Sequence, residues 1–494
     1  MSEPQRQHPV AAITKALDII RGNFITILIL IFIGGGDQAV FTLYWILGTI
    51  VALLVWGVIS WLRFSFQVEE GELRIEQGVL IRKKLYLTSD RIQVIDISAG
   101  IVQRLFGLVA VEVKTAGSSS KEAKISALTQ SKAEELKEKL RHGQAPQAVQ
   151  EAEDEEEKKF VKKYTLDTKD LLIAATTSGR MGVALSVVGA IFSQIDQLIS
   201  EEQMYQLIET HIPRSTSLSL VIMSAIAILV VAWMLSFVST IIAYYDFEVE
   251  VRDNELLIGR GLFERTQLTI PFNRIQAVQV KEELMRQPLG YVSLVIESAG
   301  YGDSQGNSAT LFPLIKKGDM YTFLEEVIPE YNYTINDGYQ RVPRRALRRY
   351  LLRMLWWTLP VILLAWGTVP YGYYAWLLLV PAMLLGYQQY RDAGIRNEDG
   401  TLVLSSRLLS KKTAIVKKYR TQATIIKQNP FQRRLNLHDF TVHVASGNQG
   451  RSFGVRDLAD DTVYEFWQWM EVSEKVSTDP QKNNENGYMP PIEG

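Results

Sequence analysis

Histidine is scarce in this chain, and its five histidines do not fall into the spacing of a catalytic or metal site. His438 and His443 lie on a strand pattern, at a spacing that places them on opposite faces of the strand. No HExxH, nucleophile-elbow or phosphate-loop motif occurs. The glycine-containing stretch 447–452 lacks the lysine of a Walker loop, and it indicates a turn between strands. We therefore expect no catalytic residues, no metal, no cofactor and no enzyme.

An arginine followed two positions later by a glutamine recurs along the chain, as Arg91 and Gln93, Arg274 and Gln276, and Arg420 and Gln422. We expect these residues to serve the fold, the arginine closing a turn and the glutamine bonding the backbone where a strand begins. The alternative is a ligand site, which for a phosphorylated headgroup needs a basic loop in every copy. Arg82 and Lys411 lie in such loops, but the second copy has Arg265-Thr-Gln there.

A dense arginine cluster precedes the last apolar stretch, and it consists of Arg341, Arg344, Arg345, Arg348, Arg349 and Arg353. Leucines interleave with these arginines, as in an interfacial helix held on anionic lipids. Each basic residue near such a surface contributes about 1 kcal/mol of binding. We expect the cluster to act as a topological anchor, and the alternative is a regulatory lipid sensor. Asp196, at the end of another apolar stretch, fits an outer helix end better than a site of ion coupling.

Composition excludes several classes of protein. Lys+Arg 53 against Asp+Glu 54 gives a net charge of −1, so the chain has no large basic field for nucleic acid. The absence of cysteine excludes disulfides and thiolate chemistry. The charges occur in blocks that alternate with uncharged stretches at 38–62, 215–245 and 354–390. The stretch 215–245 would extend about 46 Å as a helix, enough to cross a bilayer core of about 30 Å, so a membrane protein is indicated.

Shorter apolar runs at 22–36, 181–195 and 354–366 each follow an arginine and precede a longer run. We therefore predict three helical hairpins, and hence six transmembrane helices. The outer connectors carry almost no lysine or arginine, whereas the other side carries many. The positive-inside rule then places the termini and all soluble segments in the cytoplasm of a multi-pass cell-membrane protein. The runner-up function is a transport protein whose hairpins line a path.

The soluble segments are repeated. Residues 78–117 and 261–300 align without a gap, with Gly78, Arg91, Ile92, Gln93 and Gly107 among the identical positions. A third, more diverged copy has Arg407 and Asn436 in place of the two glycines, which predicts different turns. Strand-like alternation fills each copy, and each ends in a helical pattern, at 132–140, 320–328 and 461–470. This order predicts small antiparallel sheets, each closed by a helix.

The pattern Gly-Val-Leu, Asp-Arg-Ile-Gln, Leu-Phe-Gly-Leu-Val and Ala-Gly at 78–117, following a hairpin, resembles the bacterial pleckstrin-homology-like domain of the second type (bPH2). Three tandem copies resemble the YdbT type of this family. The resemblance implies a pleckstrin-like (PH-like) fold, in which a bent antiparallel sheet is capped by a C-terminal helix. It also implies a smaller one-unit bPH2 membrane protein, of YdbS type, as partner, and protection of the cell envelope against antimicrobial peptides.

The fold class that we predict is therefore membrane α-helical hairpins plus three small β-rich PH-like domains. The predicted organisation is an N-terminal amphipathic segment and hairpin (1–62), a PH-like domain (63–143), an acidic linker (144–163), a hairpin (164–245), a PH-like domain (246–329), a basic interfacial helix and hairpin (330–390), a PH-like domain (391–472) and a disordered tail (473–494). The expected function is a non-enzymatic scaffold on a bilayer with anionic headgroups.

Overall fold

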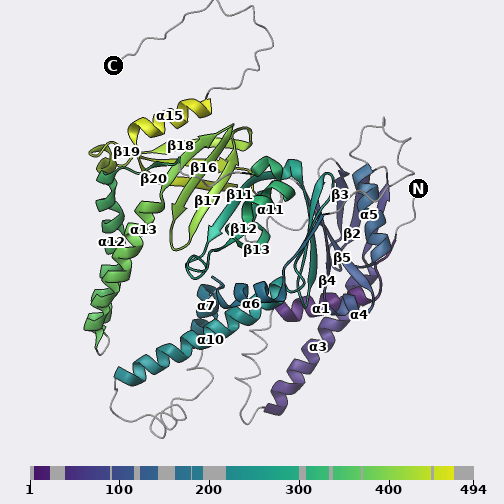
Figure 1. Ribbon diagram of the computed structural model, residues 1–494. Helices are drawn as coiled ribbons and strands as arrows, with labels where there is room; N and C mark the ends of the chain where they lie inside the picture. Colours follow the sequence, from purple (N-terminus) through teal and green to yellow (C-terminus); the bar gives the residue numbers. More distant parts are fainter. Residues whose placement is uncertain are drawn as a thin grey trace, which may run out of the picture.

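The structure is a computed structural model of the 494-residue chain. It describes residues 5–22, 39–69, 71–89, 92–115, 123–142, 162–179, 181–192, 218–299, 308–332, 338–368, 371–446 and 450–471. The described helices and strands form three successive units, which lie in a row in Figure 1. The tail, Asp196 and all of the predicted acidic linker except Lys162 and Lys163 lie outside the described residues.

Each unit contains helical segments near its start, preceded by a short strand in the second and third units, and continues with two groups of strands. The first contains α1 (Val10–Gly22), α3 (Ala39–Leu62), β1 (Ser65–Glu69), β2 (Glu72–Gln77), β3 (Lys83–Thr88), β4 (Ile92–Ala99), α4 (Ile101–Leu105), β5 (Leu108–Thr115), β6 (Ala123–Thr129) and α5 (Gln130–His142). The second contains β7 (Lys162–Thr165), α6 (Thr168–Thr176), α7 (Met181–Phe192), α10 (Leu218–Tyr244), β8 (Glu248–Val251), β9 (Glu255–Arg260), β10 (Arg265–Pro271), β11 (Ile275–Glu282), β12 (Tyr291–Ser298), β13 (Ala309–Lys316) and α11 (Met320–Val327).

The third unit contains β14 (Gln340–Arg341), α12 (Leu347–Thr368), α13 (Leu379–Asp392), β15 (Gly394–Glu398), β16 (Thr401–Arg407), β17 (Lys411–Lys417), β18 (Thr421–Lys427), α14 (Pro430–Arg433), β19 (Leu437–Val444), β20 (Arg451–Ala459) and α15 (Asp460–Glu471). The terminal helices predicted at 132–140, 320–328 and 461–470 are confirmed as α5, α11 and α15.

The sheets do not follow the unit boundaries, and this corrects the prediction of one sheet per domain. Strand β4 of the first unit pairs with β10 of the second, and β11 of the second pairs with β17 of the third. Two seven-stranded antiparallel sheets result, in the orders β6-β5-β4-β10-β9-β8-β7 and β13-β12-β11-β17-β16-β15-β14. Three-stranded sheets, β1-β2-β3 and β18-β19-β20, lie at the two ends.

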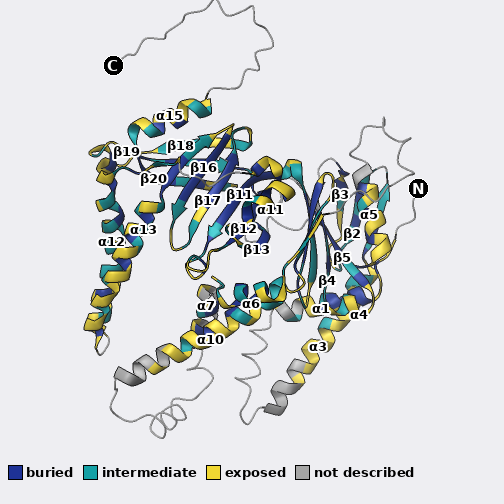
Figure 2. Cartoon of the chain, in the orientation of Figure 1, coloured by how far each residue is buried: buried dark blue, intermediate teal, exposed yellow. Residues whose placement is uncertain are grey.

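The hydrophobic cores cross the same boundaries. Val403 and Ile415 of the third unit belong to the core of the second, and Ala277 of the second belongs to the core of the third. Strand β12 is buried on both faces, because Ser446 and Arg451 of the third unit reach its fully buried Glu297. Figure 2 shows the resulting band of buried residues through the middle sheets. Neighbouring units are therefore continuous rather than tethered.

The prediction of six transmembrane helices is wrong. In the described part of the chain, two helices are long and apolar enough to cross a bilayer, Ile226–Tyr244 and Arg344–Thr368. Helix α7 is about 18 Å long, which is short for a bilayer core of about 30 Å. The third uncharged stretch is divided by a 3-10 helix, Gly372–Leu378, so that α13 is also short. Of the predicted arm at 22–36 the structure describes only Gly22, and of the arm at 181–195 it describes residues 181–192, which form α7.

The long apolar helices that the structure describes expose large apolar side chains on their surfaces. Trp356, Trp357 and Leu364 of α12 are 78%, 70% and 67% exposed, and Met223 of α10 is 65% exposed. A soluble protein rarely presents so large an apolar surface, whereas a bilayer covers it. The ends of α3, α10 and α12 that lie away from the sheets all point toward the lower left in Figure 1.

The glycines shared by the first two copies occupy turns that need a positive φ. Gly78 and Gly261 have φ of 120° and 112°, and a Cβ at either position would lie about 2 Å from a backbone oxygen. Gly107 and Gly290 have φ of 64° and 70°. Asn436 retains this conformation in the third copy, with φ of 47°, because asparagine tolerates the left-handed region. The second turn therefore keeps its shape, contrary to the prediction, whereas Arg407 has no positive φ.

Candidate functional site at the helix–sheet junctions

The third unit joins its membrane helix to its sheet through a buried carboxylate. Asp457 of β20 is fully buried and has a φ of 58°, at a register shift in the pairing of β19 with β20. Its Oδ1 accepts a hydrogen bond from Arg349 Nε at 2.6 Å, and its Oδ2 accepts one from Arg353 Nη2 at 2.7 Å. A buried carboxylate is stable only with such partners. The two arginines thus fix the start of α12 on the sheet.

A second layer of polar contacts holds Asp457 itself. Gln432 of α14 donates from Nε2 to Asp457 Oδ1 at 2.9 Å and to Asp439 at 2.6 Å. Gln432 also forms a capping box with Asn429 at the start of α14. The Tyr350 hydroxyl donates to the Arg456 carbonyl at 2.9 Å. Every oxygen of the buried carboxylate is therefore used within the protein.

Beside this junction lies a cationic cavity of about 810 Å³. Its basic lining residues are Arg353, Arg407, Lys412, Arg451 and Arg456, and no acidic residue lines it. Arg353 and Arg407 are engaged by Asp457 and Asp392, and Arg451 lies 3.6 Å from Glu297. Lys412 and Arg456 are exposed, with no ion pair among the described residues. Two positive charges are therefore available to an anion.

Apolar side chains line the same cavity. Met354 and Trp357 come from α12, Leu408 from the β16–β17 turn and Phe453 from β20. The cavity thus lies where a membrane helix meets the sheet, and its lining contains both cations and apolar side chains. This combination suits a ligand with an anionic head and an apolar tail.

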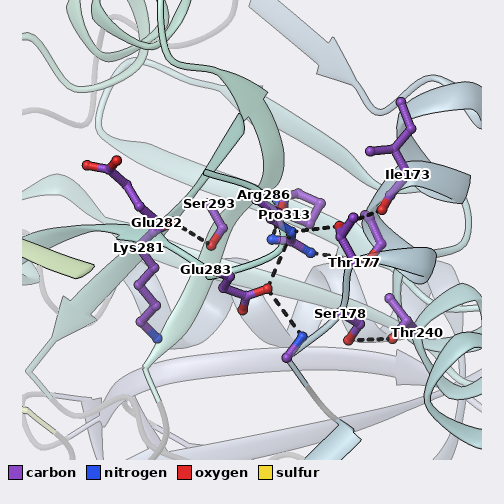
Figure 3. Close-up of polar contacts among 12 residues, drawn as sticks. Ile173, Thr177, Ser178, Thr240, Lys281, Glu282, Glu283, Arg286, Ser293 and Pro313 are labelled. Carbon is purple, nitrogen blue, oxygen red and sulfur yellow. Dashed lines mark hydrogen bonds and ion pairs between the residues drawn. The ribbon is translucent and has the colours of Figure 1, made fainter. Parts of the chain in front are cut away.

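The second unit uses an arginine for the corresponding junction, as Figure 3 shows. Arg286, between β11 and β12, is only 4% exposed. Its guanidinium donates to the carbonyls of Ala174 and Pro313, at 3.1 and 3.0 Å, and to Thr177 Oγ1 at 3.1 Å. Glu283 lies 3.3 Å from Arg286 Nε and accepts the Gly179 N–H at 3.2 Å. Burial lowers the pKa of Arg286, but arginine stays protonated.

The contact of Arg286 with Ala174 also satisfies the end of a helix. The last carbonyls of α6 have no partner within the helix, and a cation at this end is favoured by the helix dipole. From α10, Thr240 Oγ1 donates to Ser178 Oγ at 2.9 Å, just beyond α6 (Figure 3). The sheet, the short helix and the long apolar helix of this unit are thereby fixed together.

The first unit has a simpler junction. The Trp61 indole N–H donates to the Gln7 carbonyl at 2.8 Å, and Gln103 Nε2 donates to the Ser126 carbonyl at 3.3 Å. Val10 and Ala11 of α1 pack on Leu108 and Ala127. This packing explains why α1 lies against the sheet.

Sequence reasoning missed these junction residues, although a signal was present. Gln103, Arg286 and Gln432 occupy one position of the aligned repeat, just after β4, β11 and β18 respectively. Each donates a side-chain hydrogen bond at the junction of its unit. Their side chains differ, so identity alone does not mark the position. The two arginine partners of Asp457 lie more than 100 residues away along the chain.

Among the described residues, the recurrent arginine and glutamine of one unit form no hydrogen bond with those of another. Arg91 lies outside the described residues, as does the side chain of Gln93. The Arg274 carbonyl accepts hydrogen bonds from Gln276 Nε2 at 3.2 Å and from the Ala299 N–H at 2.9 Å. Arg420 lies over the ring of Tyr419 at 4.8 Å, and Gln422 is exposed.

The arginine cluster is divided between the protein and the solvent. Arg349 and Arg353 bind Asp457, and Arg345 donates to the Asn436 carbonyl at 3.0 Å. Arg341 donates to the Arg391 carbonyl at 3.4 Å, and Arg344 and Arg348 are exposed. Among the described residues no group of His, Asp or Glu is placed to hold a metal ion.

Comparison with known proteins gives two findings. Residues 15–144, 203–330 and 350–471 each match the bacterial PH domain family. The chain is also 34% identical over 490 residues to the UPF0699 transmembrane protein YdbT of Bacillus subtilis (strain 168), and the alignment covers 95% of this chain and 98% of that protein. Each match spans apolar helix as well as sheet, which agrees with a repeating unit made of both.

Proposed function

This chain belongs to the bacterial PH domain family and is a membrane protein, and on that premise we propose that it is a non-enzymatic scaffold. Its PH-like units lie on the cytoplasmic face of the cell membrane, and the cavity of the third unit binds an anionic lipid headgroup. It acts with a one-unit bPH2 membrane protein, of YdbS type, in protecting the envelope against antimicrobial peptides.

The observation that carries the scaffold role is the continuity of the sheets. Pairing of β4 with β10 and of β11 with β17 fixes the order and spacing of the units. The junctions at Arg286 and Asp457 fix two of these units on apolar helices. A row of rigidly joined domains on a membrane can hold partners at set distances, and no described residue group supports chemistry.

The position of the β-hairpin tips supports contact with the membrane surface. The Leu262 N–H donates to the Ile242 carbonyl near the end of α10, at 2.9 Å, and Gln389 of α13 donates to the Leu408 carbonyl at 2.8 Å. Phe263 and Leu408 beside these contacts are 51% and 72% exposed. Exposed apolar side chains at the ends of membrane helices fit the headgroup region.

The lipid proposal is tested with the full chain in nanodiscs of phosphatidylcholine with or without phosphatidylglycerol. We expect phosphatidylglycerol to raise the Tm of the protein and to remain bound after extraction into detergent. Replacing the two available cations by Lys412→Gln and Arg456→Gln removes both effects, because the cavity then lacks charge for the phosphate. Lys316→Gln, on the exposed edge of the second unit, leaves them unchanged.

Equal lipid retention by the double variant and the wild type contradicts the lipid site. The envelope role is tested separately, by deleting the gene and measuring the inhibitory concentration of a membrane-active peptide. We expect that concentration to fall and to recover on complementation. Co-purification with the one-unit protein from gently solubilised membranes tests the partner.

A further inference from the structure

The contact between neighbouring units occurs twice in this chain, in the same register. Gln267 of β10 lies opposite Ile97 of β4, and Thr413 of β17 lies opposite Val280 of β11. In the aligned repeat, Gln267 and Thr413 are equivalent to each other, and so are Ile97 and Val280. The same strand pairing, in the same register, therefore joins both pairs of neighbouring units.

The two ends of the row present the unused halves of this interface. Strand β3 is equivalent to β10 and β17, and β18 is equivalent to β4 and β11, yet both lie at the edges of their sheets. Strand β18 has exposed residues at Gln422, Ala423 and Lys427, whereas β11 is buried along almost its whole length. Most of β3 is exposed as well. Open edges of this kind readily pair with another strand.

We propose that β18 of one copy of this chain pairs with β3 of a second copy. Applying the register of the two internal contacts places Lys84 opposite Ile426, Leu85 opposite Ile425 and Tyr86 opposite Thr424. The interface is head-to-tail, so it generates an open row or a closed ring of chains.

We infer that the partner strand comes from a second copy of the whole chain, because each chain carries both complementary edges, β3 and β18. The loops at the two ends also match. Arg104 of the first unit donates to the Leu262 carbonyl of the second at 2.8 Å, and Arg433 stands at the equivalent position of the third unit with its side chain exposed. In the second copy Val79 is equivalent to Leu262, so its carbonyl is the acceptor that Arg433 would meet.

The membrane and the charges allow this arrangement. Over the two internal steps along the row, the free ends of α3, α10 and α12 keep pointing to the same side (Figure 1). A further step is therefore expected to keep the second copy in the same bilayer. Lys83 would face Lys427, but the internal interface already accommodates Lys412 opposite Lys281.

The absence of native cysteine makes the contact measurable by crosslinking. A Tyr86→Cys chain and a Thr424→Cys chain, with different tags, are co-expressed, and membranes are treated with a mild oxidant. The strand pairing brings the two Cα atoms within the distance that a disulfide requires. We expect a disulfide-linked dimer that carries both tags and disappears on reduction.

Matched controls separate the proposed edge from random collision. Tyr86→Cys with Tyr464→Cys uses a residue of similar exposure on α15, away from the edge, and it gives no dimer. Either cysteine variant expressed alone gives none, because the interface joins unlike strands. Tyr86 is 57% exposed and Thr424 is half-buried, so both variants fold, which an unchanged Tm verifies.

A second measurement does not depend on cysteine. The wild type in native nanodiscs has the mass of more than one chain, whereas Thr424→Lys, which places a charge on the edge, has the mass of one. The proposal is overturned by absence of the mixed dimer, by equal dimer in the control pair, or by attachment of the Thr424→Cys chain to a different protein. The lipid-retention experiment does not depend on this edge, so the two proposals fail separately.

Discussion

At the scale of single residues, the buried carboxylate of Asp457 needs compensating partners, because a buried charge is costly without them. Its charge is balanced by Arg349 and Arg353, which come from the first turns of α12. Removal of one partner from such a group costs more than the pair contributes, because it leaves a buried charge without compensation. The junction therefore stabilises the third unit only when Asp457, Arg349 and Arg353 are all present.

Asp457→Asn is expected to lower the stability of the third unit by about 3 kcal/mol, since it leaves two arginines without their carboxylate. Asparagine accepts a positive φ, so the backbone at this position is unaffected. The Tm in detergent measures the effect, and Asp461→Asn, at an exposed position of α15, is the control. Equal Tm values for the two variants would contradict the junction.

Lys281 gives the protein a pH dependence with a definite sign. Burial lowers the pKa of Lys281, and the nearby charge of Lys412 lowers it further. The unfolded chain then binds more protons than the folded one between this lowered pKa and the ordinary lysine pKa of about 10.4. Stability is expected to rise with pH through that window and to fall as the pH drops toward the folded pKa.

Lys281→Met is expected to flatten the rise in Tm over this window. Lys316→Met, at an exposed position of β13, keeps the wild-type slope. A slope that is the same in Lys281→Met and in the wild type would show that another group is responsible. Thermal unfolding in detergent at several pH values below the ordinary lysine pKa of about 10.4 measures the slopes.

At the scale of elements, the hairpin turns are set by a conformational requirement. Gly261→Ala is expected to destabilise the second unit by about 2 kcal/mol, since its φ of 112° is strained for alanine and the new Cβ meets the Glu264 oxygen at 2.1 Å. Gly318→Ala has open space and no positive φ, so it is expected to change the Tm little. Unfolding of both variants in the same detergent decides the comparison.

The elements that could be predicted are those whose signal is local. Alternating residues at 292–296 and the helical pattern at 461–470 mark β12 and α15 without reference to the rest of the chain. The pairing of β11 with β17 has no local signal, because any strand edge offers the same backbone groups. Uncharged stretches predict whole membrane helices, but the 3-10 helix at Gly372–Leu378 interrupts the last one.

The candidate site follows the same division. A repeat alignment finds the common position of Gln103, Arg286 and Gln432, but not what each contacts. The type of the recurrent Arg274 suggests a side-chain role, whereas its described hydrogen bonds are made by its carbonyl. The repeat alignment therefore locates the position, whereas the polar contacts made there depend on the three-dimensional fold.

At the scale of the whole molecule, the orientation in the membrane decides where the sheets act. Because the chain lacks cysteine, single cysteines at Tyr371 and Asn273 report the two sides. Tyr371 lies between α12 and α13, and Asn273 is exposed between β10 and β11. We expect an impermeant maleimide to label Tyr371→Cys on intact cells and Asn273→Cys only after lysis. Labelling of Asn273→Cys from outside would reverse the proposed orientation.

The use of one register for both internal contacts has a consequence for how such chains change in length. Removal of the middle unit leaves β4 next to β17, and these edges are already complementary by position in the repeat. A gene duplication that inserts a unit likewise creates no edge without a match. The gain or loss of a whole unit therefore needs no compensating substitution in the strands that pair between units. The number of units can accordingly change in evolution faster than the residues of those strands.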